Sequence, residues 1–313
     1  MPGLQGLPRP VAVVVGAGGV LGAAHVGAGY ALERQRFVPD MIIGTSVGAL
    51  DGAIAAAHPE KAAPWLDHMW TRLRRREVYP LGHPSSRAGI CTDRGLRRLI
   101  ARSGLPSRIE ERAVPFTAVA MELVTGAPAL PDHGDPESVL LASAAMPGIL
   151  PLVKRGGRTL VDGGVIAYVP VLAALQAGAA GVVVLSIGPE SPPLPAAVPR
   201  RRAGAGRPRR RAGAIAARAA LPLMHHRIER DLREVSRQIP TVVLPSGIEA
   251  WPAPWDFGRS QRLISTASRT AERFLDESRL NGPSPYRPDD PPATAASAGP
   301  GEASTFSAPG VVL

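Results

Sequence analysis

Ser46 is the residue whose surroundings most directly indicate catalysis. It lies at the centre of Gly44-Thr45-Ser46-Val47-Gly48, a G-x-S-x-G pattern between the apolar residues 41–43 and an alanine-rich stretch typical of a helix. In this pattern a sharp turn from strand to helix lifts the serine hydroxyl towards the helix N-terminus, where unpaired N–H groups favour negative charge. Gly44 and Gly48 suit the turn because neither has a Cβ. The stretch therefore predicts a nucleophile at Ser46.

The elements around Ser46 predict an α/β fold. Residues 11–15 form a β-branched apolar run that leads into a glycine loop and then a small-residue helix, and residues 41–57 repeat this strand-to-helix order. Two such units in succession indicate a parallel sheet. Further strands are expected at 115–124, 159–162, 181–187 and 241–244, with helices within 64–112 and at 140–145, 170–177, 221–238 and 259–278.

Composition sets limits on the kind of protein. The 313 residues are 45% hydrophobic, which allows a sizeable core. The single cysteine, Cys91, excludes an internal disulfide and favours a reducing compartment, so we expect a cytoplasmic protein with no metal site and no cofactor. The start of the chain lacks the pattern of a signal peptide. Residues 10–32 and 163–189 are uncharged, but their glycines and Pro170 favour buried α/β segments over membrane spans.

Three motifs in order resemble those of the patatin-like phospholipases. They are Gly18-Gly19-Val20-Leu21-Gly22, the serine motif, and Asp162-Gly163-Gly164. The segment Ala142-Ser143-Ala144-Ala145-Met146-Pro147-Gly148 also resembles a segment of that family. The resemblance covers residues 10–280. It implies a three-layer α/β sandwich with a mostly parallel central sheet flanked by helices, interrupted by a basic insertion at 189–218 and followed by a disordered tail at 281–313.

The resemblance also implies a serine–aspartate pair without a catalytic histidine. Ser46 would attack a lipid ester and Asp162 would accept its proton, giving an acyl-enzyme. A carboxylate with a pKa near 4 is a weak base, so this role requires a partly desolvated position. Backbone N–H groups of Gly18, Gly19 and Val47 would form the oxyanion hole. The supporting glycines are Gly22, Gly44, Gly48, Gly163 and Gly164.

The chain departs from the family pattern at two places. Ala17 and Leu21 stand where the glycine loop of the family usually has a glycine and a basic residue, which weakens the expectation of a charged head-group contact. Ala167 and Tyr168 stand where an Asp-Asn pair is common. His25 matches a histidine that follows the loop in the family, and as an isolated histidine on an apolar helix it is expected to be structural.

Three other interpretations remain open. A dinucleotide-binding protein would explain the glycine loop, but Asp40 precedes the second strand, whereas the ribose-binding acid should end it. An α/β-hydrolase would need a late histidine, for which His225 and His226 are the candidates. A non-catalytic lipid-binding or regulatory protein on the same fold is compatible with the altered loop.

The net charge of +10 is concentrated in the basic insertion. Its arginines could bring the protein to an anionic membrane as a peripheral contact. The insertion contains no aromatic residue for base stacking, so we expect no nucleic-acid partner. A solvated linker without a partner is the other possibility. The arginines concerned are Arg200, Arg201, Arg202, Arg207, Arg209, Arg210 and Arg211.

Overall fold

The fold is organised around one mixed sheet. The computed structural model describes residues 4–82, 89–185, 208–249 and 255–281, and within these ranges the sheet has eight strands in the order β5-β6-β3-β2-β1-β7-β8, with β4 paired to β3. The parallel strands are β1 (Val11–Val15), β2 (Met41–Thr45), β3 (Phe116–Glu122), β7 (Gly181–Leu185) and β8 (Thr241–Leu244). At one edge the pairing is antiparallel, through β4 (Pro128–Ala129), β5 (Val153–Arg155) and β6 (Arg158–Asp162).

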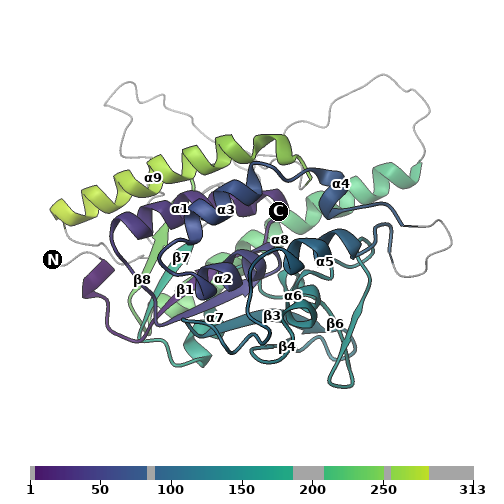
Figure 1. Cartoon of the computed structure of the whole chain (residues 1–313), viewed down its shortest axis with the longest axis horizontal. Helices are drawn as coiled ribbons and strands as arrows, with labels where there is room; N and C mark the ends of the chain where they lie inside the picture. The colour runs from purple at the N-terminus through teal and green to yellow at the C-terminus, as the bar shows by residue number, and fades with distance from the viewer. Residues whose placement is uncertain (1–3, 83–88, 186–207, 250–254, 282–313) are drawn as a thin grey trace, which may run out of the picture.

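Helices cover both faces of the sheet, so that the fold has three layers. Alternate side chains of β1 point to opposite faces: Val13 and Val15 belong to one apolar core, whereas Ala12 and Val14 belong to the other. This double burial explains why β1 is apolar at every position. The first core is covered by α1 (Gly22–Arg34), α2 (Val47–Ala57), α3 (Ala62–Trp70) and α9 (Ser260–Asn281), and the second by α7 (Val171–Gln176) and α8 (Pro208–Ser236) (Figure 1). The predicted three-layer α/β class is confirmed.

Several element boundaries differ from the sequence expectation. The stretch 64–112 contains three separate helices, α3, α4 (Arg75–Val78) and α5 (Arg94–Ala101), with residues 83–88 outside the described part of the chain. The helix α6 (Pro136–Ala144) begins earlier than expected because Asp135 caps it, accepting hydrogen bonds from the N–H groups of Glu137 and Ser138. The short edge strands β4 and β5 were not predicted, since two or three residues are too few to show a periodic pattern.

The basic insertion expected at 189–218 is only partly within the described residues. Residues 186–207 lie outside them, as does the tail 282–313. The expectation of a flexible segment up to residue 218 is wrong for its last part, because α8 begins at Pro208 rather than around Leu221. The run of alanines after residue 211 explains this, since alanine is the strongest helix former. Among the helices within the described ranges, none is long and apolar enough to cross a bilayer.

Candidate active site

The register of three strands brings Ser46 and Asp162 together. Thr45, at the end of β2, lies opposite Val119 of β3, and the next residue of β3, Ala120, lies opposite Asp162 of the antiparallel β6. Two residues 116 positions apart in sequence therefore meet across a single intervening strand. The Ser46 hydroxyl donates a hydrogen bond to Oδ2 of Asp162 at 2.6 Å. Both side chains are buried.

Ser46 has a strained backbone. Its φ of 57° and ψ of −122° lie in a region that non-glycine residues rarely adopt. The Ser46 N–H donates to Oγ of Ser143 at 2.9 Å, and that hydroxyl donates in turn to the carbonyl of Val119 at 2.6 Å. Ser143 thus fixes the turn from α6. Sequence reasoning included Ser143 in a family segment but gave it no role, although a serine within the apolar run 139–145 is a signal of such a contact.

The environment of Asp162 makes its carboxylate a stronger base. Burial raises the pKa of Asp162 from 3.8 to about 6, while hydrogen bonds from the Ser46 hydroxyl and the Gly164 N–H oppose this rise. The Gly164 N–H lies 2.7 Å from Oδ1, so each carboxylate oxygen has one donor. The Asp162 N–H donates to the carbonyl of Ala145 at 3.0 Å. A carboxylate of this kind is ionised at neutral pH and can still accept a proton.

The motif glycines allow backbone segments to approach closely. A Cβ on Gly48 would lie 2.3 Å from the carbonyl oxygens of Val15 and Gly16, so the first turn of α2 can pack against the end of β1 only without a side chain. A Cβ on Gly163 would lie 2.2 Å from the carbonyl oxygen of Val119. Gly22, Gly44 and Gly164 are similarly enclosed, each with a neighbouring atom within 3.0 Å of the Cβ position.

The glycine loop lies beside the Ser46–Asp162 pair. The Cβ of Ala17 is 3.2 Å from the Cβ position of Gly164, and the Ala17 N–H donates to the carbonyl of Tyr168 at 2.7 Å. Gly18 and Gly19 have positive φ values of 154° and 58°. Among the described residues, the hydrogen bonds outside the helix and strand ladders include none from the N–H of Gly18, Gly19 or Val47.

An apolar cavity opens at Ser46. Gly19, Ser46 and Val47 form one end of it, and the rings of Trp70 and Phe257 stack in its wall at a centroid distance of 6.0 Å. The cavity is lined mainly by apolar side chains, as small-molecule sites usually are. Such a cavity suits an aliphatic chain whose polar end lies at the serine. The walls include six leucines: Leu50, Leu73, Leu96, Leu99, Leu140 and Leu150.

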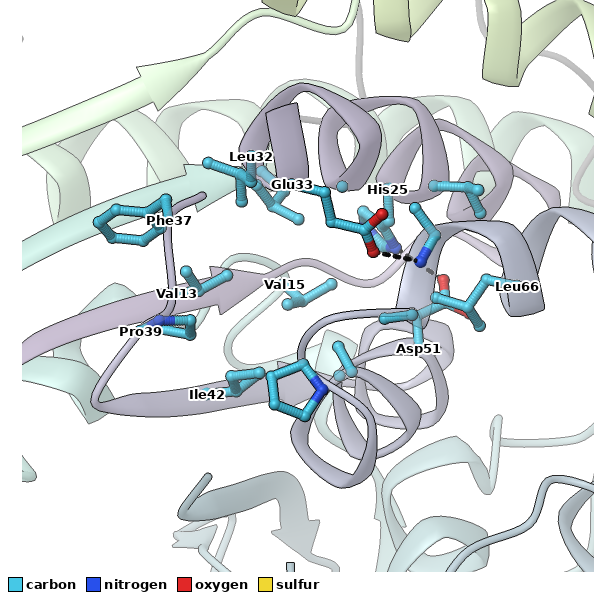
Figure 2. A pocket seen from close by; sticks show the side chains of 18 residues that line it. Val13, Val15, His25, Leu32, Glu33, Phe37, Pro39, Ile42, Asp51 and Leu66 are labelled. Carbon is cyan, nitrogen blue, oxygen red and sulfur yellow. Dashed lines mark hydrogen bonds and ion pairs between the residues drawn. The ribbon is translucent and has the colours of Figure 1, made fainter. Parts of the chain in front are cut away.

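His25 lies away from the Ser46–Asp162 pair, in a second cavity. Figure 2 shows this cavity between the strand residues Val13 and Val15 and the helices that carry His25 and Asp51. His25 Nδ1 is 2.9 Å from Oδ2 of Asp51, whose Oδ1 accepts a hydrogen bond from the Trp70 indole at 3.0 Å. Burial raises the pKa of Asp51 against the opposing effect of these two bonds. The three side chains join α1, α2 and α3.

Neither the dinucleotide nor the histidine-triad interpretation gains support from the geometry. Asp40 precedes β2 and accepts a hydrogen bond from the Val11 N–H at 2.6 Å, so it lies where the strands begin, whereas Ser46 lies where they end. His225 faces Glu229 at 2.9 Å on α8. Among the described residues, no histidine forms a hydrogen bond with Ser46 or Asp162.

Comparison with known proteins identifies the family. A family model described as "Patatin-like phospholipase" matches residues 13–175, just over half of the chain. The chain belongs to the patatin-like phospholipase family. The match includes the glycine loop, the serine motif and Asp162, and it confirms the resemblance found in the sequence.

Individual relatives of this patatin-like protein match over part of their length. An uncharacterized NTE family protein of Mycobacterium bovis is 33% identical over 165 residues, covering 52% of this chain and 44% of that protein. Lysophospholipase NTE1 of Mycosarcoma maydis is 27% identical over 187 residues, covering 57% of this chain and 10% of that protein. The chain therefore spans less than half the length of these curated relatives. The crystal structure of VipD from Legionella pneumophila matches with a TM-score of 0.44 and 13% identity, covering 88% of this chain and 69% of that one.

Proposed function

We propose that this patatin-like protein is a lipid acyl hydrolase that cleaves carboxylic esters through an acyl-enzyme on Ser46. The observation that carries the proposal is the 2.6 Å hydrogen bond between Ser46 and Asp162 at the end of an apolar cavity. A nucleophile, a base of raised pKa and a site for an aliphatic chain are thereby combined. No cofactor enters the scheme.

The chemistry follows from the positions of the two side chains. As Ser46 Oγ attacks the ester carbonyl, Asp162 Oδ2 takes its proton, and the N–H groups of Gly18, Gly19 and Val47 stabilise the oxyanion. When the tetrahedral intermediate collapses, the C–O bond to the alcohol breaks and Asp162 returns the proton to the leaving oxygen. Water then attacks the acyl-enzyme with Asp162 again accepting a proton, which passes to Ser46 as the free fatty acid leaves.

The substrate class is a fatty acyl ester of phospholipid or lysophospholipid type. The apolar lining of the cavity supports an acyl chain, and one relative carries the name lysophospholipase. Leu21 replaces the basic residue usual in the loop of the family, so a charged head group would have no partner at that position. Selectivity should therefore depend mainly on the acyl chain.

The proposal is tested by combining ester hydrolysis with active-site labelling. Ser46→Ala should abolish fatty-acid release and labelling by a fluorophosphonate, and Asp162→Asn should lower kcat by several orders of magnitude. A double change of His225 and His226 to Ala is the control and should leave activity within about twofold. If the histidine double mutant folded but were inactive, the Ser–Asp mechanism would have to be replaced by a triad that includes a histidine.

A non-catalytic, lipid-binding protein is the second candidate, because Ala17 and Leu21 alter the glycine loop. Fluorophosphonate labelling separates the two. A purified protein that binds lipid but neither reacts with the probe at Ser46 nor releases fatty acid would establish the second candidate.

A peripheral membrane contact through residues 200–211 stays a prediction. Arg200, Arg201, Arg202 and Arg207 lie outside the described residues, and the side chains of Arg209 to Arg211 at the start of α8 are not described. Co-sedimentation with anionic vesicles, before and after changing the seven arginines to serine, tests it.

A further inference from the structure

Several exposed apolar side chains belong to segments that also supply the lining of the Ser46 cavity or the Ser46–Asp162 pair. Ten large apolar side chains are exposed among the described residues. Isolated exposed apolar residues are common on protein surfaces, but a concentrated group marks a contact with another molecule or a membrane. Half of the ten are linked, by two or three residues of chain or by backbone hydrogen bonds, to segments of the cavity lining or to Asp162: Leu81 (74% exposed), Ile90 (63%), Val165 (52%), Trp255 (50%) and Leu152 (47%).

Hydrogen bonds connect Leu81 and Ile90 to the wall of the cavity. Leu81 pairs with Cys91 in a β-bridge, and the Gly82 N–H donates to the carbonyl of Ile90 at 2.9 Å. The Ile90 N–H donates in turn to the carbonyl of Gly148 at 3.2 Å. Gly148 ends the segment 142–148, which supplies two residues of the cavity lining. Backbone bonds therefore connect both residues to a segment that lines the cavity.

The other three exposed residues lie within three positions in sequence of residues of the site. Val165 ends the short 3-10 helix η3 (Gly163–Val165), which directly follows Asp162. Leu152 comes two residues after Leu150 of the cavity lining. Trp255 comes two residues before Phe257, which stacks in the same wall.

Arginines are exposed on two helices that also line the cavity. The inner sides of α4 and α5 line the cavity through Val78 and Leu96, while Arg75, Arg76, Arg94 and Arg98 on these helices are exposed. Residues 74–82 and 89–98 contain six arginines and two acidic residues. Among the described residues, Arg97 is the member of this group that forms ion pairs, with Asp93 and Glu137. The Arg75 guanidinium lies 5.6 Å from the centre of the Trp255 ring, which joins the basic group to the apolar one.

We propose that this mouth surface, formed by Leu81, Ile90, Leu152, Val165 and Trp255 with Arg75, Arg76, Arg94 and Arg98, docks on a lipid bilayer that carries anionic head groups. The proposal rests on the proposed function, since it describes how that site meets its substrate. Apolar side chains insert at the boundary of head groups and acyl chains, tryptophan favours this depth, and arginine binds lipid phosphates. An acyl chain can then pass from the bilayer to Ser46 without crossing water. The surface is distinct from residues 200–211.

Vesicle co-sedimentation with the full chain tests the proposal. All proteins carry Ser46→Ala so that vesicles stay intact, and phosphatidylcholine vesicles are compared with vesicles containing about 30% phosphatidylglycerol. Changing Arg75, Arg76, Arg94 and Arg98 to Ser should weaken binding to the anionic vesicles at least tenfold, since each arginine near the surface contributes about fivefold. The matched control changes four exposed arginines elsewhere, which removes the same charge and should weaken binding less than threefold: Arg237, Arg262, Arg269 and Arg273.

Insertion has its own readout. The emission of Trp255 should shift to shorter wavelength on binding to anionic vesicles, and Trp255→Phe should remove most of that shift. Equal loss of binding in the two arginine quadruple variants, or full binding by the variant of the mouth, would overturn the proposal. Binding to duplex DNA is measured in parallel. If the mouth variant lost DNA binding but bound vesicles as before, the proposal would be overturned and the arginines would be assigned to nucleic-acid binding.

The docking proposal and the proposed hydrolase function can be refuted independently of each other. If the mouth variant without the Ser46→Ala change hydrolyses a soluble short-chain ester normally but loses vesicle binding, both proposals stand. If vesicles bind as expected and no ester is hydrolysed by the chain with Ser46 intact, the docking surface stands and the hydrolase proposal falls.

Discussion

Asp162→Asn should abolish the proposed ester hydrolysis and at the same time stabilise the fold. The unfolded chain ionises this carboxyl near 3.8, whereas burial raises the pKa of Asp162 in the folded protein to about 6. Between these two values the folded state binds more protons than the unfolded state, so the free energy of unfolding falls as pH rises. Below about pH 3.8 the carboxyl is protonated in both states, so its burial does not lower the free energy of unfolding through ionisation. Above about pH 6 it is ionised in both states, so the decrease in the free energy of unfolding is complete and no longer changes with pH.

The size of this effect follows from the two pKa values. The difference between 3.8 and about 6 corresponds to about 3 kcal/mol at neutral pH. Asparagine is uncharged and nearly the same shape, and its oxygen can still accept the hydrogen bond from the Gly164 N–H. The variant should therefore exceed the unmutated protein in stability by about 1 kcal/mol at pH 4.5 and about 3 kcal/mol at pH 7.5.

Urea unfolding at the two pH values measures the difference directly. Asp276→Asn, at an exposed position on α9, is the control for removing one negative charge from a basic protein, and its effect should stay within about 0.5 kcal/mol. An Asp162→Asn protein that is no more stable than the unmutated one at pH 7.5, or equally stabilised at both pH values, would refute the assignment of a buried, ionised base.

Four further outcomes follow from the same site. The kcat/KM for a soluble ester should fall about tenfold per pH unit below about pH 6 and level off above it, because Asp162 must be ionised to accept the proton; an unchanged rate at pH 5 would contradict its role. Ser143→Ala should lower kcat about tenfold with little change in KM, since the buried Ser46 N–H loses its acceptor. Ala144→Phe should raise KM for long acyl chains and leave short ones unaffected, as measured with a chain-length series. Gly48→Ala should destabilise the fold by about 3 kcal/mol in urea unfolding, because its Cβ would meet two carbonyl oxygens.

The parallel part of the sheet could be predicted because burial on both faces makes its strands mainly apolar. Strands β1 and β8 have the bounds expected from the sequence, and β2 follows the apolar run before Ser46. The start of α8 was missed because arginine and proline around residues 207–211 outweighed the alanines that follow. Local composition favoured a linker, whereas helix propensity and the packing of Leu232 and Val235 against the sheet favour a helix.

The site was only partly predictable for a different reason. Ser46 and Asp162 were named from their motifs, but the contact between them depends on the register of β2, β3 and β6, which no local pattern specifies. Ser143 illustrates the same limit. Its hydroxyl acts through two long-range bonds, to Ser46 and Val119, and neither is encoded near residue 143. Motifs therefore pointed to the two side chains of the proposed mechanism, whereas the contacts that position them could be seen only in the tertiary structure.

The carbonyl of Val119 helps to hold Ser46 and Asp162 in direct contact, with no imidazole between them. It accepts the Ser143 hydroxyl that holds the Ser46 turn, and the backbone of Gly163 passes so close that a Cβ there would lie 2.2 Å away. One peptide group of β3 therefore lies against both the turn that carries Ser46 and the strand end that carries Asp162. Direct contact at 2.6 Å follows from that backbone rather than from flexible side chains. In the proposed mechanism the same carboxylate must take and return the proton, and a pKa of about 6 suits both steps because it lies close to neutral pH.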